Sequence, residues 1–597
     1  MNKTAATVAH QRFAIGIDLG TTNTAVGFVA IDDDKAAPAV FLLPQVVAAQ
    51  ESRPLELLPS FLYQPAATEL PDGALALPWD PARAFAVGAF ARDRASSVPG
   101  RVIASAKSWL VHPGVDRRAA ILPFGAAADS DVKKLSPVDV QARLLGHVCE
   151  AWDHAHPEAP LAQQHVVLTV PASFDVVART LTEEAAAAAG LPHCVLLEEP
   201  QAALYAWIAF HGDAWRKQVA PGDQILVVDV GGGTTDFSLI AVTDDGAGNL
   251  SLERKAVGDH ILLGGDNMDL ALAWRVKLRL EGEGKNVDDW QLRALTHSCR
   301  QAKEAMLEDK SVDERTVVIP GRGSKLIGGS IKATLTRAEL EESLVEGFFP
   351  VVDANAKPQQ LKRAGLQTLG LPYAADAAIT RHLAAFLNGQ KPTALLFNGG
   401  VTRSPRLQER IVDVVKGWQS SVRVLGGADL DLAVAKGAAS YARVRAQHKG
   451  LRIKGGAARA YYVGFEKSEL AVPGMAPRVD AVCIAPQGME EGSEAEIATV
   501  LGLVVGEPAQ FRFFASRKRA EDKAGAVVDV AKALSASDPE LVEVAPIETT
   551  LLGTAGALVP VTLRSRVTEL GTLELFAQES ETLAQHKLEF SIRGDEA

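Results

Sequence analysis

Two stretches of similar sequence decide the fold of this chain: IGIDLGTTNTAVGFV at residues 15–29 and ILVVDVGGGTTDFSLIAV at residues 225–242. Each consists of an apolar run, an aspartate, a turn rich in Gly and Thr, and a second apolar run. Short apolar runs bounded by glycine are typical of buried strands. The same hairpin recurs after about 210 residues, which predicts two related lobes that face each other, each of ordinary domain size.

The turns of both hairpins have the chemistry of a phosphate site. Glycine lets the backbone approach a ligand closely, successive N–H groups form an anion-binding concavity, and threonine hydroxyls donate further hydrogen bonds. An aspartate at the strand end can hold a hydrated Mg²⁺. One such turn is usually only a turn, but two of them, one in each lobe, predict a clamp on a polyphosphate.

A third glycine turn lies in ALLFNGGVTRSPRLQERI at residues 394–411, between a buried strand and a helix. Gly399 and Gly400 leave space in which a base or ribose could pack, although such a junction taken alone more often serves close packing. The turn lacks the GxxxxGKS/T pattern of a Walker A loop, and the GxGxxG pattern of a Rossmann fold is missing after the first strand.

The hydrophobic pattern divides the chain into segments of different character. Apolar runs alternate with amphipathic stretches such as LTEEAAAAAG up to about residue 445, which predicts an α/β architecture. The stretch HKGLRIKGGAARA suits an exposed linker, and the alternation with period two beyond it predicts half-buried strands. The pattern leaves VVDVAKALSAS, around Val527, undecided. We expect a disordered tail at 1–12, an α/β unit at 13–445, a linker at 446–458 and a β-rich domain at 459–597.

Charge and cysteine content argue against several classes of protein. The chain has 61 Lys and Arg against 73 Asp and Glu, a net charge of −12, whereas nucleic acids and anionic membranes attract basic proteins. None of the 4 cysteines lies in a CxxC pair, which argues against a zinc ribbon and fits a reducing compartment. With no signal peptide and no apolar run of ~18 residues, we expect a cytoplasmic protein without membrane or nucleic-acid partners.

The three glycine turns, in this order, resemble the nucleotide-binding domain of the heat shock protein 70 (DnaK-like) chaperone family. That domain has the two-lobed actin/hexokinase-type ATPase fold, with ribonuclease H-like lobes. The resemblance covers most of residues 13–444. It implies lobes at roughly 13–220 and 221–400, closed by 401–445, and a β-sandwich-like domain after the linker.

The resemblance also implies the residues of an ATP site. ASAKSWLVH resembles the segment with the family's catalytic lysine, here Lys107, and Glu199 in CVLLEEPQAALYAW matches a catalytic-site carboxylate. Pro171 and Arg179 match the proline switch and the arginine that relay nucleotide state. The residues matched to the nucleotide are Gly20, Thr21, Thr22, Asn23, Gly231, Gly232, Gly233, Gly265, Lys303, Gly399, Gly400, Arg403 and Asp431.

The family's chemistry implies a slow hydrolysis of ATP to ADP and phosphate. Phosphoryl transfer to water needs charge neutralisation and an aligned nucleophile. Mg²⁺ would be held largely through waters by Asp18 and Asp229, and Lys107 would orient the attacking water. Four further side chains would lie around the terminal phosphate: Glu199 and Asp236 would help to position the water and the metal, and Thr234 and Thr21 would donate hydrogen bonds to the phosphate.

The sequence departs from the family's pattern in three places. In the adenosine-contacting helix, Arg300 stands where the family often has an acidic residue, and Glu304 where many members have a stacking arginine. LRIKGGAARA is unlike the family's acidic and leucine-rich linker. The resemblance implies a J-domain co-chaperone and a nucleotide exchange factor as partners, and the linker is where this chain departs from the members that they regulate. The segment GLQTLGLPYAADAAITRHLAAFLNGQ also matches the usual members poorly.

The C-terminal segment resembles the family more faintly. VPVTLRSRVTELGTLELFAQ at residues 559–578 is similar to a strand pair late in the substrate-binding β-sandwich. The chain ends at Ala597, so we expect no helical lid. The leading hypothesis is an ATP-dependent chaperone that binds unfolded or partly folded clients. The alternatives are an ATP-regulated scaffold with one dedicated partner, a small-molecule kinase of the same fold and a filament-forming actin relative.

Overall fold

The structure is a computed structural model. It describes residues 11–590 apart from 113, 125, 127–130, 245–249, 322–329, 360–369, 428, 449–450, 452, 454–455, 458, 471–473, 475–476, 491, 536–538, 551–555, 569–572, 581 and 583. Most of the expected N-terminal tail and part of the expected linker therefore lie outside the described residues.

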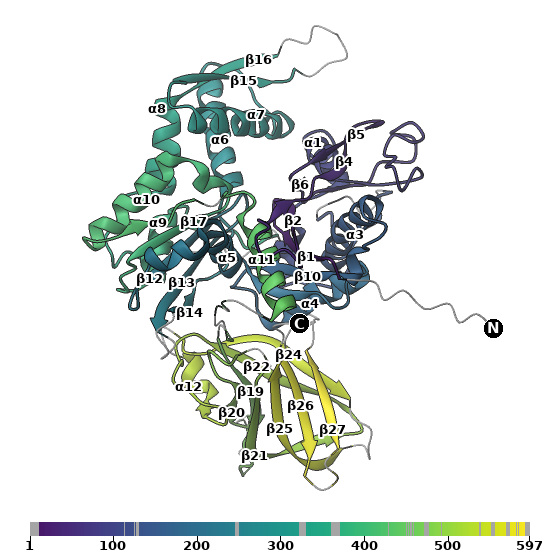
Figure 1. Ribbon diagram of the computed structural model, residues 1–597, viewed down its shortest axis with the longest axis vertical. Helices are drawn as coiled ribbons and strands as arrows, with labels where there is room; N and C mark the ends of the chain where they lie inside the picture. Colours follow the sequence, from purple (N-terminus) through teal and green to yellow (C-terminus); the bar gives the residue numbers. More distant parts are fainter. Residues whose placement is uncertain are drawn as a thin grey trace, which may run out of the picture.

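The first sequence hairpin forms the centre of a mixed sheet (Figure 1). Its strands, β1 and β2, pair antiparallel, and β1 pairs in parallel with β10, which pairs in parallel with β11. The short strands β3 and β6 both pair with β2. The bounds are β1 Phe13–Leu19, β2 Asn23–Ala30, β3 Ala39–Val40, β6 Leu58–Pro59, β10 His165–Val170 and β11 Val195–Glu198.

The second hairpin forms the centre of a sheet with the same local topology. Strands β12 and β13 pair antiparallel, β12 pairs in parallel with β17, and β14 and β18 complete the order β14-β13-β12-β17-β18. The bounds are β12 Gln224–Val230, β13 Thr235–Asp244, β14 Leu250–Val257, β17 Ala394–Asn398 and β18 Arg423–Val424. The repeat seen in the sequence thus corresponds to two related sheets.

Two helices with small side chains lie between these sheets. Helix α5 (Glu199–His211) packs on α11 (Ala433–Gln447), and both share one apolar core with β1, β10, β12 and β17. The stripe of small residues in α11 allows very close approach, since a Cβ on Gly16 of β1 would lie 2.4 Å from the carbonyl oxygen of Ala435. Small residues on both sides therefore bring the two sheets together.

The remaining elements of the α/β part surround these sheets. LTEEAAAAAG lies in α4 and RQAKEAMLED in α7, as their helix-forming composition predicts. The helices are α1 Ala89–Arg94, α2 Ala106–Trp109, α3 Pro137–Ala155, α4 Val176–Ala188, α6 Gly265–Gly282, α7 Asp289–Glu308, α8 Arg337–Leu340, α9 Ile379–Leu387 and α10 Pro405–Trp418. The short strands are β4 Leu43–Ala48, β5 Glu51–Leu55, β7 Leu62–Tyr63, β8 Ala86–Val87, β9 Val102–Ile103, β15 Glu314–Ile319 and β16 Ile331–Thr336.

The C-terminal part consists of antiparallel strands in the order β21-β25-β26-β27-β24-β22-β19-β20-β23. The undecided segment around Val527 forms a short strand and then a helix, because the carboxylate of Asp529 accepts a hydrogen bond from the backbone N–H of Lys532. The bounds are β19 Ala460–Glu466, β20 Val479–Ala485, β21 Glu494–Val505, β22 Pro508–Ser516, β23 Val527–Asp529, α12 Val530–Ser535, β24 Val542–Thr550, β25 Ala557–Val567, β26 Leu573–Glu579 and β27 Gln585–Phe590.

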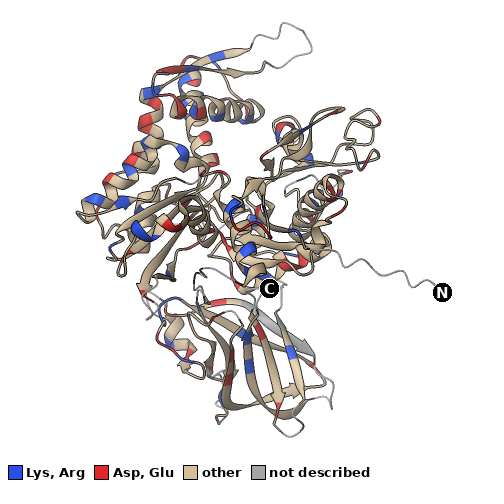
Figure 2. Ribbon diagram, viewed as in Figure 1, with Lys and Arg blue, Asp and Glu red and all other residues tan. Residues whose placement is uncertain are grey.

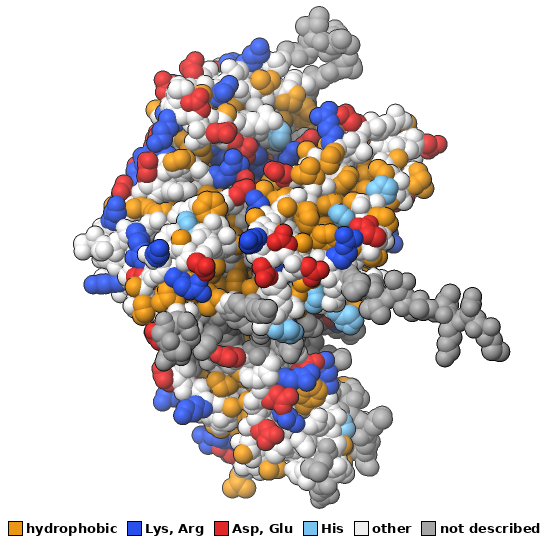
Figure 3. Space-filling model, viewed as in Figure 1, with side chains coloured by type: hydrophobic (Ala, Val, Ile, Leu, Met, Phe, Trp, Pro, Cys, Tyr) orange, Lys and Arg blue, Asp and Glu red, His pale blue; other side chains and the backbone are white. Residues whose placement is uncertain are grey.

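This β-rich part packs against the α/β part beside α4 (Figure 1). Val176 of α4 belongs to the same apolar cluster as Tyr461 and Val482 of the β-rich part. Charges of both signs are interspersed along the chain (Figure 2), and apolar side chains gather over the region of α3 and β6 on the face drawn in Figure 3. Among the described residues, no helix has the length and apolar character that crossing a membrane requires.

Candidate functional site

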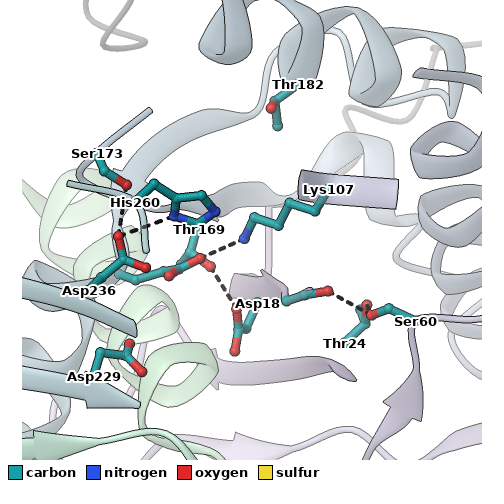
Figure 4. Close-up of polar contacts among 12 residues, drawn as sticks. Asp18, Thr24, Ser60, Lys107, Thr169, Ser173, Thr182, Asp229, Asp236 and His260 are labelled. Carbon is teal, nitrogen blue, oxygen red and sulfur yellow. Dashed lines mark hydrogen bonds and ion pairs between the residues drawn. The ribbon is translucent and has the colours of Figure 1, made fainter. Parts of the chain in front are cut away.

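The two aspartates of the sequence hairpins occupy equivalent places in the two lobes. In the first lobe, the hydroxyl of Thr169 on β10 donates to Oδ1 of Asp18 over 3.0 Å. In the second, Nδ2 of Asn398 on β17 donates to Oδ2 of Asp229 over 2.6 Å. Each aspartate is therefore oriented by a polar side chain from the neighbouring parallel strand, and Figure 4 shows both carboxylates in one cluster.

A buried ion pair lies beside these carboxylates (Figure 4). The Nζ atom of Lys107, on α2, is 2.6 Å from Oε1 of Glu199, the first residue of α5, and their side chains are 4% and 14% exposed. Lys107 also lies over the ring of Phe174, 5.8 Å from its centroid. The tertiary structure thus brings together a lysine and a glutamate that are 92 residues apart in the chain.

Asp236, at the start of the strand that follows the second turn, has two hydrogen-bond partners. The hydroxyl of Ser173 donates to Oδ1 of Asp236 over 2.8 Å. Nδ1 of His260 lies 3.2 Å from the same oxygen. Ser173 follows β10 and His260 precedes α6, so Asp236 links elements of both lobes.

The carboxylates of this cluster destabilise one another's charged forms. Burial raises the pKa of Asp18 to about 7, helped by the charge of Glu199 and opposed by Lys107 and the Thr169 hydroxyl. Burial and the charge of Glu199 also raise the pKa of Asp229 well above its ordinary value, and the hydrogen bond from Asn398 opposes this. Only direct neutralisation or a change of protonation relieves such repulsion.

The donor set fits a hydrated Mg²⁺. Asp18 and Asp229 face each other and both have raised pKa values. A divalent cation between them would be electrostatically favoured. Among the described residues, no group of three or more His, Cys, Asp or Glu is arranged to enclose a metal ion. Asp18 and Asp229 would be the residues that hold the cation, and this assignment stays a prediction.

The two Gly/Thr turns lie in direct contact. A Cβ on Gly232 would lie 2.5 Å from the hydroxyl of Thr22, and a Cβ on Gly233 would lie 3.1 Å from a methyl group of Thr21. A side chain at Gly232 would therefore collide with Thr22 unless Thr22 moved. Gly399 has a φ of +85°, a conformation that favours glycine, and its Cα faces the backbone of Val230. The third turn, at Gly399 and Gly400, therefore lies against the end of β12, the strand that leads into the second turn.

The residues matched to adenosine lie on α6, α7 and the third turn. Lys303 pairs with Asp269 over 2.7 Å and lies 3.4 Å from the carbonyl oxygen of Gly265. Arg300 pairs with Asp269 over 2.7 Å and also with Asp266. Arg300 is thus held by two carboxylates of α6, which accounts for a basic residue at this position.

Arg403, the residue matched to base stacking, lies at the edge of the site. Its side chain is 59% exposed and pairs with Asp431 over 2.7 Å. Glu304 is exposed on α7. The ion pair fixes the guanidinium beside Gly400, because a Cβ on Gly400 would lie 3.3 Å from the carboxylate of Asp431.

Pro171 and Arg179, the residues matched to the family's relay of nucleotide state, lie before and after Ser173 in the sequence. Pro171 directly follows β10, and Nη2 of Arg179, on α4, donates to Oε1 of Glu198 over 2.7 Å. Arg254 of β14 also pairs with Glu198. Glu198 directly precedes Glu199 in the chain, so the ion pairs that Glu198 forms with the two arginines lie next to the ion pair of Glu199 with Lys107.

The structure places several side chains in the site that the sequence did not predict. They orient the candidate residues and comprise Thr169, Ser173, His260, Asp269 and Asn398. Asn398 directly precedes the third glycine turn, and a polar residue at the end of a buried strand could have been predicted to lie in the site. His260 begins the stretch HILLGGDNMDLALAW, but nothing in its spacing points to Asp236.

Comparison with known proteins identifies relatives of this chain. A model of the family described as Hsp70 protein matches residues 83–372. A "Chaperone protein HscA homolog" of Bordetella pertussis is 29% identical over 450 residues, 74% of this chain and 60% of the relative. "Heat shock 70 kDa protein BIP3" of Oryza sativa subsp. japonica is 28% identical over 382 residues, 60% of this chain and 49% of the relative.

A further relative is the "Chaperone protein HscA homolog" of Acidithiobacillus ferrooxidans. It is 31% identical over 379 residues, 61% of this chain and 51% of the relative. The chain thus spans about half to three-fifths of the length of the curated relatives that it matches.

Proposed function

Because this chain belongs to the Hsp70 family, whose members are ATPases with a two-lobed actin-like fold, we propose that it is an ATP-dependent chaperone-type protein. It binds ATP between the lobes and hydrolyses it slowly to ADP and phosphate. The observation that carries the proposal is the meeting of Asp18 and Asp229 from equivalent hairpins beside the Lys107–Glu199 pair.

The chain's own residues divide the work of hydrolysis. The backbone N–H groups of the two contacting turns bind the phosphates, with Thr21 and Thr234 donating from their hydroxyls. Lys107 offers its ammonium to the terminal phosphate and orients the attacking water, and Glu199 holds the ammonium in place. Mg²⁺, when bound, neutralises phosphate charge. Asp18 and Asp229 are the residues that hold it.

The proposed client-binding part is the β-rich segment at 459–597, taken as a β-sandwich-like domain. The family resemblance supports this assignment, and so does the hairpin of β25 and β26, in which Val567 pairs with Leu573. Clients are unfolded or partly folded proteins, and a J-domain co-chaperone and a nucleotide exchange factor are the proposed regulators. We place these activities in the cytoplasm.

Contacts between the parts provide a route by which nucleotide state can affect clients. Arg254 pairs with Glu198 and donates to the carbonyl oxygen of Gly456. Nη2 of Arg459 donates to the carbonyl oxygen of Ser173 over 3.3 Å. These contacts connect the region of Pro171 and Arg179 to the start of the β-rich part.

Two measurements on the full chain test the proposal. The first is ATP hydrolysis at a single turnover with Mg²⁺, together with the affinity for ATP and ADP. The second is binding to an array of unrelated unfolded peptides, compared in ATP and in ADP. Nucleotide-dependent binding to many peptides supports a chaperone. Binding of nucleotide with no peptide binding favours a scaffold for one partner, and absence of nucleotide binding contradicts the proposal.

A further inference from the structure

His260 is a buried side chain with one nitrogen in use and one without a partner. Its Nδ1 lies 3.2 Å from Oδ1 of Asp236, and the side chain is 8% exposed. The edge of its ring meets the face of Phe174, with centroids 5.8 Å apart and planes at 80°. Within the part of the chain that the structure describes, Nε2 is buried and has no hydrogen-bond partner.

The contacts of Asp236 fix the tautomer of His260. An ionised carboxylate only accepts hydrogen bonds, and its Oδ1 already accepts one from the hydroxyl of Ser173. Nδ1 of His260 must therefore carry the hydrogen that bonds Asp236. In the neutral ring this leaves a lone pair on Nε2, so Nε2 is a base and an acceptor.

An acceptor that is buried without a donor is unfavourable, and such groups in native proteins commonly face a water or serve in catalysis. Figure 4 shows the ring between Asp236 and Lys107, with its second nitrogen on the side of Lys107. His260 and Lys107 also contact the same ring, that of Phe174. The lone pair of His260 thus faces the place where the attacking water is expected.

We propose that Nε2 of His260 accepts a hydrogen bond from the water that attacks the terminal phosphate of ATP, and that Asp236 holds His260 in the tautomer that makes this possible. The proposal rests on the ATP hydrolysis proposed above. The water oxygen bonds to the terminal phosphorus while the bond from that phosphorus to the bridging oxygen breaks, and its electrons leave with ADP. One proton of the water stays on the phosphate; the other passes to Nε2 and then to solvent.

The loop that carries His260 is held from the β-rich part. Asp259, the preceding residue, pairs with Arg517, and Ser173 accepts from Arg459 through its carbonyl oxygen. Both partners of Asp236 therefore lie in segments that contact the β-rich part. The orientation of the imidazole itself comes from Asp236 and from the ring of Phe174.

Two substitutions separate the roles of the two nitrogens. In His260→Asn, the side-chain amide still offers a hydrogen-bond donor near the position of Nδ1 but has no acceptor at the position of Nε2. In His260→Gln, the longer side chain places its amide oxygen, an acceptor, near the position of Nε2. We expect His260→Asn to slow single-turnover hydrolysis at least about 10-fold, with ATP affinity within about twofold of the parent chain. His260→Gln should hydrolyse several-fold faster than His260→Asn. His297→Asn, an exposed histidine of α7, is the matched control and should leave the rate unchanged.

Each other outcome overturns the proposal. If His260→Asn hydrolyses ATP within about twofold of the parent chain, no base acts at Nε2. If His260→Gln is slower than His260→Asn, the contact with Asp236 is the only role of the ring. Should His260→Asn fail to fold by thermal melting, His260→Ala replaces it, and added imidazole must restore its hydrolysis. A parent chain that binds no ATP contradicts the proposed function as well, whereas failure of these variants alone does not.

Discussion

Each lobe orients its aspartate by a side chain that comes from the next parallel strand. Thr169 performs this for Asp18 and Asn398 for Asp229. A hydrogen bond to the charged form opposes the rise in pKa that burial causes. The two bonds therefore keep the carboxylates closer to the ionised form that a cation requires.

Lys107 is the residue whose removal should separate binding from catalysis. Lys107→Ala should lower single-turnover ATP hydrolysis by about 100-fold or more, because the site loses a preorganised cation where charge develops. ATP affinity should remain close to that of the parent chain, because the backbone of the two turns binds the phosphates. Radiolabelled ATP hydrolysis and equilibrium nucleotide binding measure the two quantities.

A lysine on the surface provides the control for this variant. Lys310 is 65% exposed and pairs with Glu409 over 3.4 Å, so Lys310→Ala should hydrolyse ATP at the parent rate. Retained turnover in Lys107→Ala would rule out the catalytic assignment of this lysine.

At the scale of elements, α11 depends on glycine where it crosses α5. A Cβ on Gly437 would lie 1.8 Å from the carbonyl oxygen of Ala202, and a backbone atom cannot move aside as a flexible side chain can. Gly437→Ala should therefore lower the free energy of unfolding by about 1–3 kcal/mol through overpacking, and it should weaken ATP binding by separating the lobes. Urea denaturation and nucleotide titration are the measurements.

Gly417 of α10 offers a matched comparison. A Cβ at this position would meet nothing within 4 Å, so Gly417→Ala should leave the free energy of unfolding unchanged or raise it by up to about 1 kcal/mol, as alanine is the better helix former. Equal effects of the two substitutions would contradict the packing argument.

The start of α9 depends on a buried carboxylate that titrates far below its usual range. Burial alone would raise the pKa of Asp376, but hydrogen bonds from Arg381 and from the backbone N–H groups of Gln359 and Ala378 outweigh it and lower the pKa. Asp376 lies in the segment that matches the usual family members poorly. The part of that segment at 365–369 lies outside the described residues.

The sign of the pH effect follows from this lowered pKa. The folded chain binds the proton of Asp376 more weakly than the unfolded chain, so the stabilisation is present above the ordinary carboxylate pKa of about 4 and is lost as the pH falls through lower values. Asp376→Asn should lower the free energy of unfolding by about 1–3 kcal/mol at pH 7, since the half-buried Arg381 and the backbone N–H groups of Gln359 and Ala378 lose their charged acceptor. Denaturation curves at pH 7 and near pH 3 should show a smaller difference at the lower pH; an equal difference would contradict the assignment.

At the scale of the whole molecule, Arg254 connects Glu198, beside the proposed nucleotide site, to the β-rich part. It pairs with Glu198, which also binds Arg179, and it donates to the carbonyl oxygen of Gly456. Arg254→Ala should keep ATP hydrolysis within about threefold of the parent chain, since Lys107 and Glu199 stay paired, but peptide affinity should no longer differ between ATP and ADP. Fluorescence anisotropy of a bound peptide in each nucleotide measures the difference.

An exposed arginine controls for the loss of positive charge. Arg216 is 47% exposed and pairs with Asp213 over 3.2 Å, so Arg216→Ala should retain the nucleotide-dependent difference. A difference that persists in Arg254→Ala would show that coupling does not depend on this contact.

The sequence by itself determined the features that are local in the chain. The two hairpins, their turns and the change from α/β to β-rich pattern follow from apolar periodicity and glycine content over windows of ten to twenty residues, and family membership followed from the order of these motifs. The sequence did not predict the structure around Val527, because a three-residue strand and a six-residue helix are too short to show a periodic pattern of apolar residues.

Only the tertiary structure decided which side chains meet. Thr169 reaches Asp18, and His260 and Ser173 reach Asp236, because parallel strand pairing and the loop before α6 bring distant positions within hydrogen-bond distance. Such contacts depend on strand register and on the orientation of single side chains, neither of which leaves a period in the sequence. The sequence therefore predicted where phosphate and metal bind, and the fold determined which side chains are the hydrogen-bond partners of the residues proposed to act there.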